Sequence, residues 1–504
     1  MLNIENRRGK IKEPPSAEVV RWIIQPGINA DIDHAYQCYL DINKAHVLML
    51  AKQGIIADDV ANSILKVTDE MAKMGKQPSF PIDPSKEDTY FNLEHYLIER
   101  TGLDIGGQQH TARSRNDLLA TVTRLYTRDF YLDICDLFNK MREVVLQVAK
   151  NNTDAVMSGY THLQPSEPIT FAHYCSAILS ALERDYRRIS AVYQSLNLCP
   201  LGGGSMGSTT FDIDRDMTAQ LLGFDEPLDN SIDCVASRDY ASELLAALSL
   251  ACNTFSRFCF DLYIWATPDY GYVEVADSEA VCSSIMPQKK NPWTLEHVKG
   301  KCAHIEGFFI SCINAMKNTP YTHNQDVNGE GTYFLWTALV ETKACLELLT
   351  KTVSGITLHK DKMIKTARGN FCTVTELANY LVRHDHISFR AAHEIVALVV
   401  DYMITHDKKA NEIGTDVVND IFYQLFGKKT CMTDDDIQRA LDPVLNAQSK
   451  TVKGGTAEKE VLRQLARRQQ HLEQDQQENS QRRAHLCNAK ETLEKAVQDR
   501  IFNV

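Results

Sequence analysis

Two long stretches of this chain contain no proline, and this feature constrains its fold most. Proline removes a backbone donor and clashes with the preceding helical turn, so its absence permits long helices. No proline lies between residues 84 and 165 or between residues 320 and 443. Within residues 238–265, apolar residues recur every three or four positions: Leu244, Leu248, Cys252, Phe255, Cys259 and Leu262. This stripe predicts a long core helix.

The rest of the sequence favours a mainly α fold with more than one region. No strand patterns alternate with helices, so a nucleotide-binding parallel sheet is not expected, and the glycine-rich residues 201–208 are better explained as a connecting loop. A chain of 504 residues exceeds what one core organises, since domains of roughly 100 to 200 residues are the norm. Thr373 and Glu376 resemble a capping box, so a C-terminal region is expected from about residue 366.

Charge, cysteine and hydropathy patterns exclude several classes of protein. The net charge of -12 argues against a general nucleic-acid binder, which needs a broad basic surface. The 14 cysteines form no Cys-x-x-Cys pair and no Cys/His cluster at zinc spacing, so no metal is expected. No signal-peptide pattern is visible, and no apolar run approaches the roughly 18 residues that span a bilayer. We therefore expect a cytoplasmic protein without membrane contact.

From about Ala457 the chain becomes rich in Gln, Arg and Glu. Leu465, Leu472, Leu486 and Leu493 fall in heptad register, but Asn479 interrupts the row. A helix that pairs with a partner chain remains open. A solvated terminal helix or a partly disordered tail is the favoured prediction.

Three polar clusters could provide chemistry, and the first is HTARSRND, residues 110–117. Ser114, Arg115 and Asn116 offer a hydroxyl, a planar fork of donors and an amide, which together suit a carboxylate. Taken alone, this cluster is more simply explained as the polar N-terminus of a helix.

The other two clusters are GYTHLQPSEP, residues 159–168, and SSIMPQKKNP, residues 283–292. The first contains Thr161 and His162, and a histidine held by a partner can act as a general acid or base. A lone histidine is more often structural. The second combines two hydroxyls, two lysines and an asparagine in a loop, where a hydroxyl lies beside cationic groups.

The last cluster resembles the signature G-S-S-x-M-P-x-K-x-N of the fumarase and aspartase superfamily, with Cys282 in the glycine position. Together with HTARSRND and THLQP, the chain is similar to the argininosuccinate lyase branch. Further agreement, up to about residue 466, comes from residues 237–239, 376–383, 389–394 and 454–457.

This resemblance implies a mainly α fold of three domains. Residues 1–113 would form an N-terminal helical domain, residues 114–365 a central bundle of long helices, and residues 366–504 a C-terminal helical domain with a polar tail. It also implies a homotetramer in which the three clusters meet from different subunits at each active site. No cofactor or metal is implied, and the partner molecule is a small dicarboxylate or amino-acid substrate.

The resemblance also assigns roles to residues. Ser283 would be the base that removes the proton beside the succinyl carboxylate, while Lys289 would stabilise the enolate-like intermediate. His162 would pair with Glu296, and the role of that pair stays open. The substrate-binding residues implied are Ser114, Arg115, Asn116, Thr161, Ser284, Met286, Asn291, Arg238, Trp293, His323 and Asn328.

The sequence departs from argininosuccinate lyases where the amine portion of the substrate should bind. The family motif T-Y-N-[KR]-D-x-Q-E-D-K becomes THNQDVNGEG in residues 322–331, so His323, Asn328 and Gly331 replace tyrosine, glutamine and lysine. Trp293 replaces an aspartate that would suit a guanidinium. Each lost polar contact is worth roughly 1 to 3 kcal/mol if buried.

These departures give three alternatives for function. The favoured prediction is a carbon-nitrogen lyase that releases fumarate from an N-substituted aspartate of the aminopolycarboxylate type, such as ethylenediamine-disuccinate. Cleavage of argininosuccinate is the second alternative, and a non-catalytic, crystallin-like relative is the third. The intact Ser283, Lys289, Asn291 and His162 weigh against the third.

Overall fold

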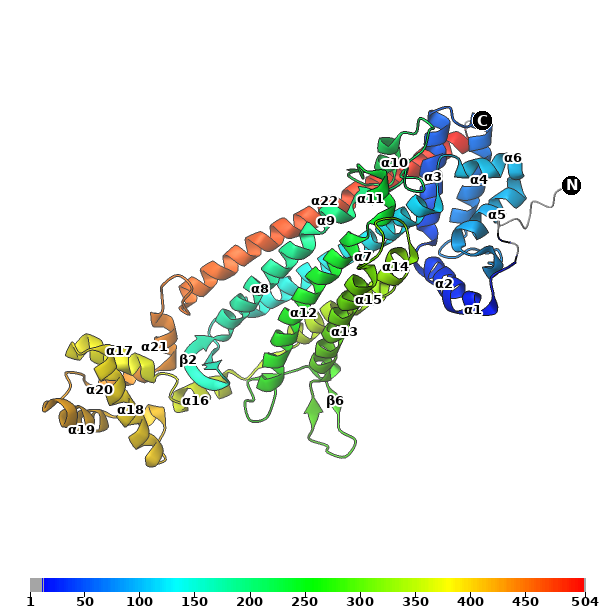
Figure 1. The fold of residues 1–504 in the computed structure, drawn as a ribbon. Coiled ribbons are helices and arrows are strands. Elements are labelled where there is room, and N and C mark those ends of the chain that lie inside the picture. The colour runs from blue at the N-terminus through cyan, green and yellow to red at the C-terminus, as the bar shows by residue number, and fades with distance from the viewer. Residues whose placement is uncertain (1–10, 12, 503–504) are drawn as a thin grey trace.

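Long helices run side by side through the middle of the molecule, and a smaller group of helices lies at each end (Figure 1). This computed structural model describes residue 11 and residues 13–502. The central helices are α7 (Arg115–Lys150), α8 (Phe171–Ala191), α9 (Tyr193–Leu196), α10 (Arg215–Leu221), α11 (Ser231–Ala236), α12 (Asp239–Trp265), α13 (Trp293–Met316), α14 (Gln325–Asn328) and α15 (Leu335–Ser354).

The two end regions are also helical. The N-terminal elements are α1 (Ala17–Val19), the π-helix η2 (Val20–Ile24), α2 (Gln25–His34), α3 (Tyr36–Lys52), α4 (Asp58–Ala72), α5 (Thr89–Thr101) and α6 (Leu103–Gly106). The helices of the C-terminal end are α16 (Lys360–Gly369), α17 (Val374–Asp385), α18 (Phe389–Thr405), α19 (Thr415–Phe426), α20 (Asp434–Leu441) and α21 (Pro443–Ser449). They are followed by α22 (Glu458–Phe502), which runs along the bundle (Figure 1).

Strands occur only as short pairs in the described part of the chain. Three pairs are antiparallel and one, β3 with β4, is parallel. The pairs are β1 (Val156–Thr161) with β2 (Gln164–Thr170), β3 (Leu198–Cys199) with β4 (Glu226–Pro227), β5 (Val273–Glu274) with β8 (Thr357–Leu358), and β6 (Val281–Cys282) with β7 (Lys290–Asn291). The prediction of a mainly α chain without a parallel nucleotide-binding sheet is confirmed.

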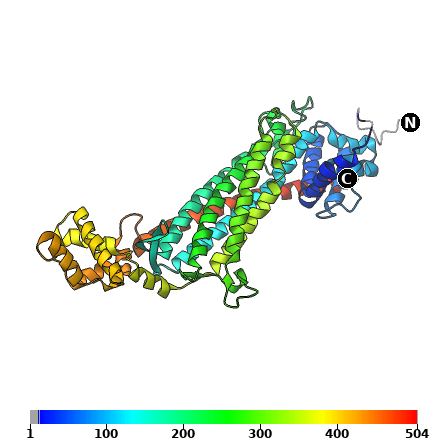
Figure 2. The ribbon, with the colours of Figure 1, turned by 60° about the horizontal axis from the view of Figure 1, so that its bottom comes forward.

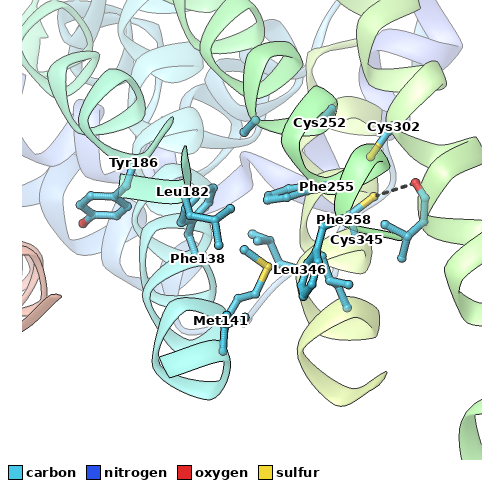
Figure 3. Close-up of a cluster of buried hydrophobic side chains, with 14 of the residues drawn as sticks. Phe138, Met141, Leu182, Tyr186, Cys252, Phe255, Phe258, Cys302, Cys345 and Leu346 are labelled. Atoms are coloured by element: carbon cyan, nitrogen blue, oxygen red, sulfur yellow. Dashed lines mark hydrogen bonds between the residues drawn. The ribbon is translucent and has the colours of Figure 1, made fainter. Parts of the chain in front are cut away.

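The core of the bundle explains why its helices are long. All six residues of the predicted stripe in α12 are buried. They pack with side chains from α7, α8 and α15, as Figure 3 shows for Phe138, Leu182, Phe255 and Leu346. Burying a side chain of this size contributes about 1.5 to 3 kcal/mol, so the bundle provides a rigid frame for groups at its ends.

Two further hydrophobic clusters lie at the ends of the molecule. One joins α3, α4 and α5 to the start of α7 and the end of α22, and the other lies within α17 to α20. The boundary expected near residue 366 falls inside α16 (Lys360–Gly369). The predicted boundaries at residues 113 and 365 stay predictions.

The C-terminal tail differs from its favoured prediction. It is a single helix, α22, that runs back along the bundle to the N-terminal region (Figures 1 and 2). Leu465, Leu472 and Leu493 of the heptad row are buried against this same chain. Asn479, which interrupts the row, is also buried and donates to the carbonyl of Leu132 over 3.3 Å and to the Asp136 carboxylate.

The predicted capping box at Thr373 does not form, although α17 begins at the next residue. The backbone of Thr373 is already helical, and its buried hydroxyl has no partner among the described residues. The Glu376 carboxylate instead accepts hydrogen bonds from Asn379 and Arg383. The cap is lost because the chain enters this helix from a helical turn and not from an extended residue.

Candidate active site

The HTARSRND segment forms the N-terminus of α7. Ser114 has an extended backbone and caps the helix, accepting a hydrogen bond from the Asn116 amide over 3.2 Å. The Asn116 side chain donates to the Ser205 carbonyl over 3.0 Å. The buried Asp117 carboxylate accepts from the amides of Gly202 and Gly204, each over 2.9 Å. The glycine-rich loop is therefore fixed beside the predicted carboxylate-binding residues.

The contact between Asp117 and the glycine-rich loop was not predicted from the sequence. Residues 201–208 form a loop, as predicted, but the loop contributes to the site region and does more than connect two helices. Gly202 and Gly204 have φ values of +89° and +64°, which favour glycine, and the amides of both donate to the Asp117 carboxylate. No feature of the sequence links residue 117 to residues 202 and 204, since the pairing depends on how α7 and the loop pack.

Arg115 is held by acidic neighbours. Its Nη1 atom lies 3.0 Å from a Glu87 carboxylate oxygen and 2.8 Å from one of Asp88. Its guanidinium also packs over the ring of Phe91 at 4.4 Å. This arrangement orients the side chain, and a substrate carboxylate would compete with the two acids for it.

Arg238 is a buried cation at the start of α12. Only 2% of the residue is exposed, and burial lowers the pKa of its guanidinium to about 10. Nη1 donates to the Ser237 carbonyl over 2.7 Å, whereas Nε and Nη2 have no partner among the described residues. A carboxylate could accept hydrogen bonds from both of these buried donors and neutralise the charge of the guanidinium.

His323 and Asn328 lie close to these two arginines. Burial, followed by the charges of Arg238 and Arg115, lowers the pKa of His323 to about 4, so its ring is neutral at pH 7. The ring Nδ1 is 3.0 Å from Asn328 Nδ2. We name Ser114, Arg115, Asn116, Arg238, His323 and Asn328 the arginine cluster.

The third predicted cluster lies on the loop between β6 and β7. Ser283 Oγ accepts hydrogen bonds from the amides of Ile285 and Met286 over 3.3 and 3.1 Å. Asn291 donates to the Val281 carbonyl over 3.1 Å, which closes the base of the hairpin. Ser284, Met286 and Lys289 are exposed, so this loop, residues 283–292, presents its polar groups outward. We name it the serine loop.

The two lysines of the serine loop differ in their contacts. Lys290 pairs with Glu274 over 2.8 Å and with Asp277 over 2.6 Å. Lys289 has no carboxylate partner among the described residues. Lys289 is therefore the lysine whose charge remains available to a ligand, in agreement with the role that the resemblance implies for it.

Thr161 and His162 lie at the turn between β1 and β2. His162 and Leu163 have positive φ values of 56° and 59°, as a two-residue hairpin turn requires. Both Thr161 and His162 are exposed. The predicted partner Glu296 accepts from the Tyr263 hydroxyl over 3.0 Å, and no contact joins His162 to Glu296 within the described chain.

One chain does not bring these groups together. Helix α7 has 36 residues, so its two ends, at Arg115 and at Lys150 before β1, lie about 54 Å apart. Helix α13 has 24 residues, so its two ends, one after the serine loop and one before the segment that contains His323, lie about 36 Å apart. Figure 1 shows α14 near the N-terminal helices and β2 and β6 at the other end of the bundle. The predicted site residues therefore lie at opposite ends of the bundle within one chain (Figure 1).

Trp293 lies where α13 begins, directly after the serine loop. It is 42% exposed, and its ring meets the His297 ring edge-on with centroids 5.3 Å apart. An exposed indole at this position offers an apolar surface to whatever binds beside the loop.

Metal-ligand clusters and membrane-spanning helices are both absent from the described residues. No three His, Cys, Asp or Glu side chains gather there as ligands of a metal ion would. Nor is any helix in that part of the chain long and apolar enough to cross a membrane.

Replacing Arg238 by methionine should weaken fumarate binding and preserve the fold. Losing one charged hydrogen-bonding group should weaken binding by about 10- to 100-fold. The melting temperature should stay the same or rise, because a buried cation with unsatisfied donors is removed. Arg142→Met is the matched control, since buried Arg142 pairs with Asp475 over 2.6 Å and its loss should lower the melting temperature. Calorimetry of both variants measures each effect, and unchanged fumarate affinity in Arg238→Met would contradict the assignment.

Comparison with known proteins gives consistent matches. A family model described as "Lyase" matches residues 30–307, and one described as "Argininosuccinate lyase C-terminal" matches residues 371–446. "Argininosuccinate lyase 1" of Shouchella clausii is 47% identical over 95% of this chain and 96% of its own length. "Argininosuccinate lyase" of Methanocaldococcus jannaschii is 34% identical over 97% of this chain and 98% of its own.

Solved structures agree on the fold. An EDDS lyase in complex with formate is 30% identical, with a TM-score of 0.87 over 97% of both chains. A class II fumarase from Schistosoma mansoni has a TM-score of 0.68 at 15% identity, over 86% of this chain and 96% of its own, which shows the fold alone. The mainly α, three-domain fold predicted from the sequence is confirmed, and the protein belongs to the argininosuccinate lyase family of the fumarase/aspartase superfamily.

Proposed function

We propose that the protein cleaves the carbon-nitrogen bond of argininosuccinate and releases fumarate and arginine. The observation that supports this most is the 47% identity, over 95% of the chain, to a relative named argininosuccinate lyase. This similarity favours the second of the alternatives derived from the sequence over the aminopolycarboxylate. With either substrate the enzyme is a carbon-nitrogen lyase that forms fumarate.

The arginine cluster is the proposed site for the succinate carboxylates. Arg238 has two buried donors that find no partner within the described part of the chain, and Arg115 and Asn116 lie at the N-terminus of α7. Charge-assisted bonds to a carboxylate would satisfy the Arg238 donors and offset the cost of burying that cation.

The serine loop of another chain would supply the chemistry. Ser283 removes the proton from the carbon beside one carboxylate, and Lys289 and Asn291 stabilise the negative charge that develops there. The electron pair left on that carbon then forms the double bond of fumarate as the carbon-nitrogen bond breaks. The nitrogen leaves with the two electrons of that bond and gains a proton. Each preorganised donor of this kind is worth about 3 to 4 kcal/mol in the transition state. His162 and Glu296 are proposed to orient or protonate the leaving nitrogen.

A homotetramer would bring these separate groups together. Exposed apolar residues lie on α12, α13 and α15, the helices that run between the two ends of the bundle; they are Leu250, Phe260, Ile310, Ile313 and Val340. An exposed apolar face of this kind marks an association surface. Packing copies of the chain along these helices would place the serine loop of one beside the arginine cluster of another.

An aminopolycarboxylate remains the second candidate substrate. It is favoured by His323, whose neutral ring replaces a tyrosine, and by Trp293, which provides no charge for a guanidinium. The similarity to EDDS lyases, at 30% identity, points the same way. Both candidates share the fumarate half and differ only in the amine.

The ratio of kcat/KM for argininosuccinate and for ethylenediamine-disuccinate decides between them. We expect kcat/KM to be at least about tenfold higher for argininosuccinate, which corresponds to about 1.4 kcal/mol of transition-state binding. Fumarate release, followed by the absorbance of the conjugated diacid, measures both reactions. A preference for the diamine substrate would replace the first candidate by the second. Fumarate from neither substrate would contradict both and favour a non-catalytic relative.

A further inference from the structure

A groove between α8 and α22 lies outside the candidate active site. Its volume is about 610 Å³, and one face of each helix lines it. Figure 1 shows these two helices beside each other. The lining is strongly basic, with Arg184 and Arg187 from α8 and Arg467, Arg468 and Arg482 from α22. We name it the arginine groove.

The acidic residues of this lining are already neutralised. Each of the three carboxylates has an arginine partner: Glu183 pairs with Arg468, Asp475 with Arg142 and Glu478 with Arg482. Arg184, Arg187 and Arg467 are exposed and have no carboxylate partner within the described residues. Arg184 donates only to the carbonyl and hydroxyl oxygens of Ser180. The groove therefore has three unpaired positive charges.

The positive charges extend along the groove. The two helices run parallel, because Ser176 contacts Gln464 over 2.8 Å and Ser190, further along α8, contacts Arg482 over 3.2 Å. The unpaired arginines and Arg482 therefore follow one another over about ten residues of α8, or about 15 Å. A single phosphate or carboxylate is too short to contact several of them, whereas a linear anion with a charge on every unit can.

We propose that the arginine groove binds a linear oligophosphate. A guanidinium matches the geometry of phosphate oxygens with two parallel hydrogen bonds, so a row of arginines suits a row of phosphates. The lining contains no Phe, Tyr or Trp, and the ring of its one histidine, His471, lies 3.3 Å from the Glu183 carboxylate. We therefore expect a nucleoside triphosphate to bind mainly through its phosphate chain.

The groove lies on a different side of the bundle from the exposed apolar helices. Helix α22 packs against α7 and α8, while α13 packs against α12 and α15. Association of chains along α12, α13 and α15 therefore leaves the groove open to solvent. The site is separate from the proposed catalytic groups and does not depend on the proposed reaction.

Calorimetry of the purified full chain with phosphates of increasing length tests the proposal. Affinity should rise from orthophosphate through pyrophosphate to tripolyphosphate, and it should fall with added salt. Arg184→Gln, Arg187→Gln and Arg467→Gln should each weaken tripolyphosphate binding about tenfold, since each removes a charge-assisted bond. The triple variant should show no measurable binding. Fumarate release should be unchanged in all of them.

A control variant removes three positive charges from the surface outside the arginine groove. Arg439, Lys459 and Lys495 are exposed, lie outside the groove and can be replaced together by glutamine. This triple variant should bind tripolyphosphate like the parent. Equal losses in both triple variants, or affinity that does not rise with chain length, would overturn the proposal. ATP should bind with the same affinity as tripolyphosphate. Binding of ATP without binding of tripolyphosphate, or tighter binding of polyglutamate than of tripolyphosphate, would also overturn the proposal. Melting temperatures identify any variant that fails to fold, and the chain-length series on the parent then decides.

Discussion

Ser283→Ala should lower the rate of fumarate release by about a thousandfold or more, because it removes the proposed base from the reaction. The residue lies on an exposed loop outside the hydrophobic core, so no cavity forms and the melting temperature should not change. Ser283 also accepts two amide hydrogen bonds, from Ile285 and Met286, so some local loosening of the loop is expected.

Ser284→Ala is the matched control, since it removes a hydroxyl from the adjacent position of the same loop. Its side chain makes no hydrogen bond within the described residues, and its loss should lower the rate much less than the loss of the Ser283 hydroxyl. Activity of Ser283→Ala within about tenfold of the parent would exclude it as the base. The base would then be sought at Ser284.

Mixing two inactive variants should restore activity if the active site is shared between chains. His162→Asn keeps a residue that tolerates the positive φ of the β1–β2 turn while removing the imidazole. When it is reassembled with Ser283→Ala, about a quarter of the sites in a random symmetric oligomer would lack both lesions. Fumarate release should therefore recover to a measurable fraction of the parent rate.

Mass spectrometry of the mixed sample must show hybrid oligomers before the result is interpreted. Each variant reassembled with itself serves as the control and should stay inactive. Proven hybrids without recovered activity would contradict a site that takes His162 and Ser283 from different chains.

The sequence predicts local structure well because that structure depends on local patterns. The apolar stripe of α12 and the loop character of residues 283–292 follow from spacing and from residue type. The capping box at Thr373 was wrong, because the preceding chain enters α17 in a helical conformation. Non-local packing decided that outcome, and a single sequence does not reveal it.

Non-local packing also determines the position of the C-terminal helix and one contact beside the candidate site, and the sequence predicted neither. Only one of the two rows that form a coiled-coil seam is apolar, which favours a solvated helix, yet α22 is fixed by Asn479 and by leucines that pack on distant helices. Asp117 likewise contacts a loop about 85 residues away in the sequence. In contrast, Ser114, Arg115 and Asn116 belong to one motif and lie together at the N-terminus of α7, and their role in substrate binding stays a prediction.

A crystal structure of the assembled protein with fumarate bound tests whether the active site is shared between chains. We expect Arg238 and Arg115 of one chain to hold fumarate while Ser283 and Lys289 of another chain, and His162 of a further one, approach the same molecule. The distance from Ser283 Oγ to a fumarate methine carbon should be about 3 to 3.5 Å, as a reactive arrangement requires. Fumarate contacted by a single chain, or bound away from Ser283, would contradict the account.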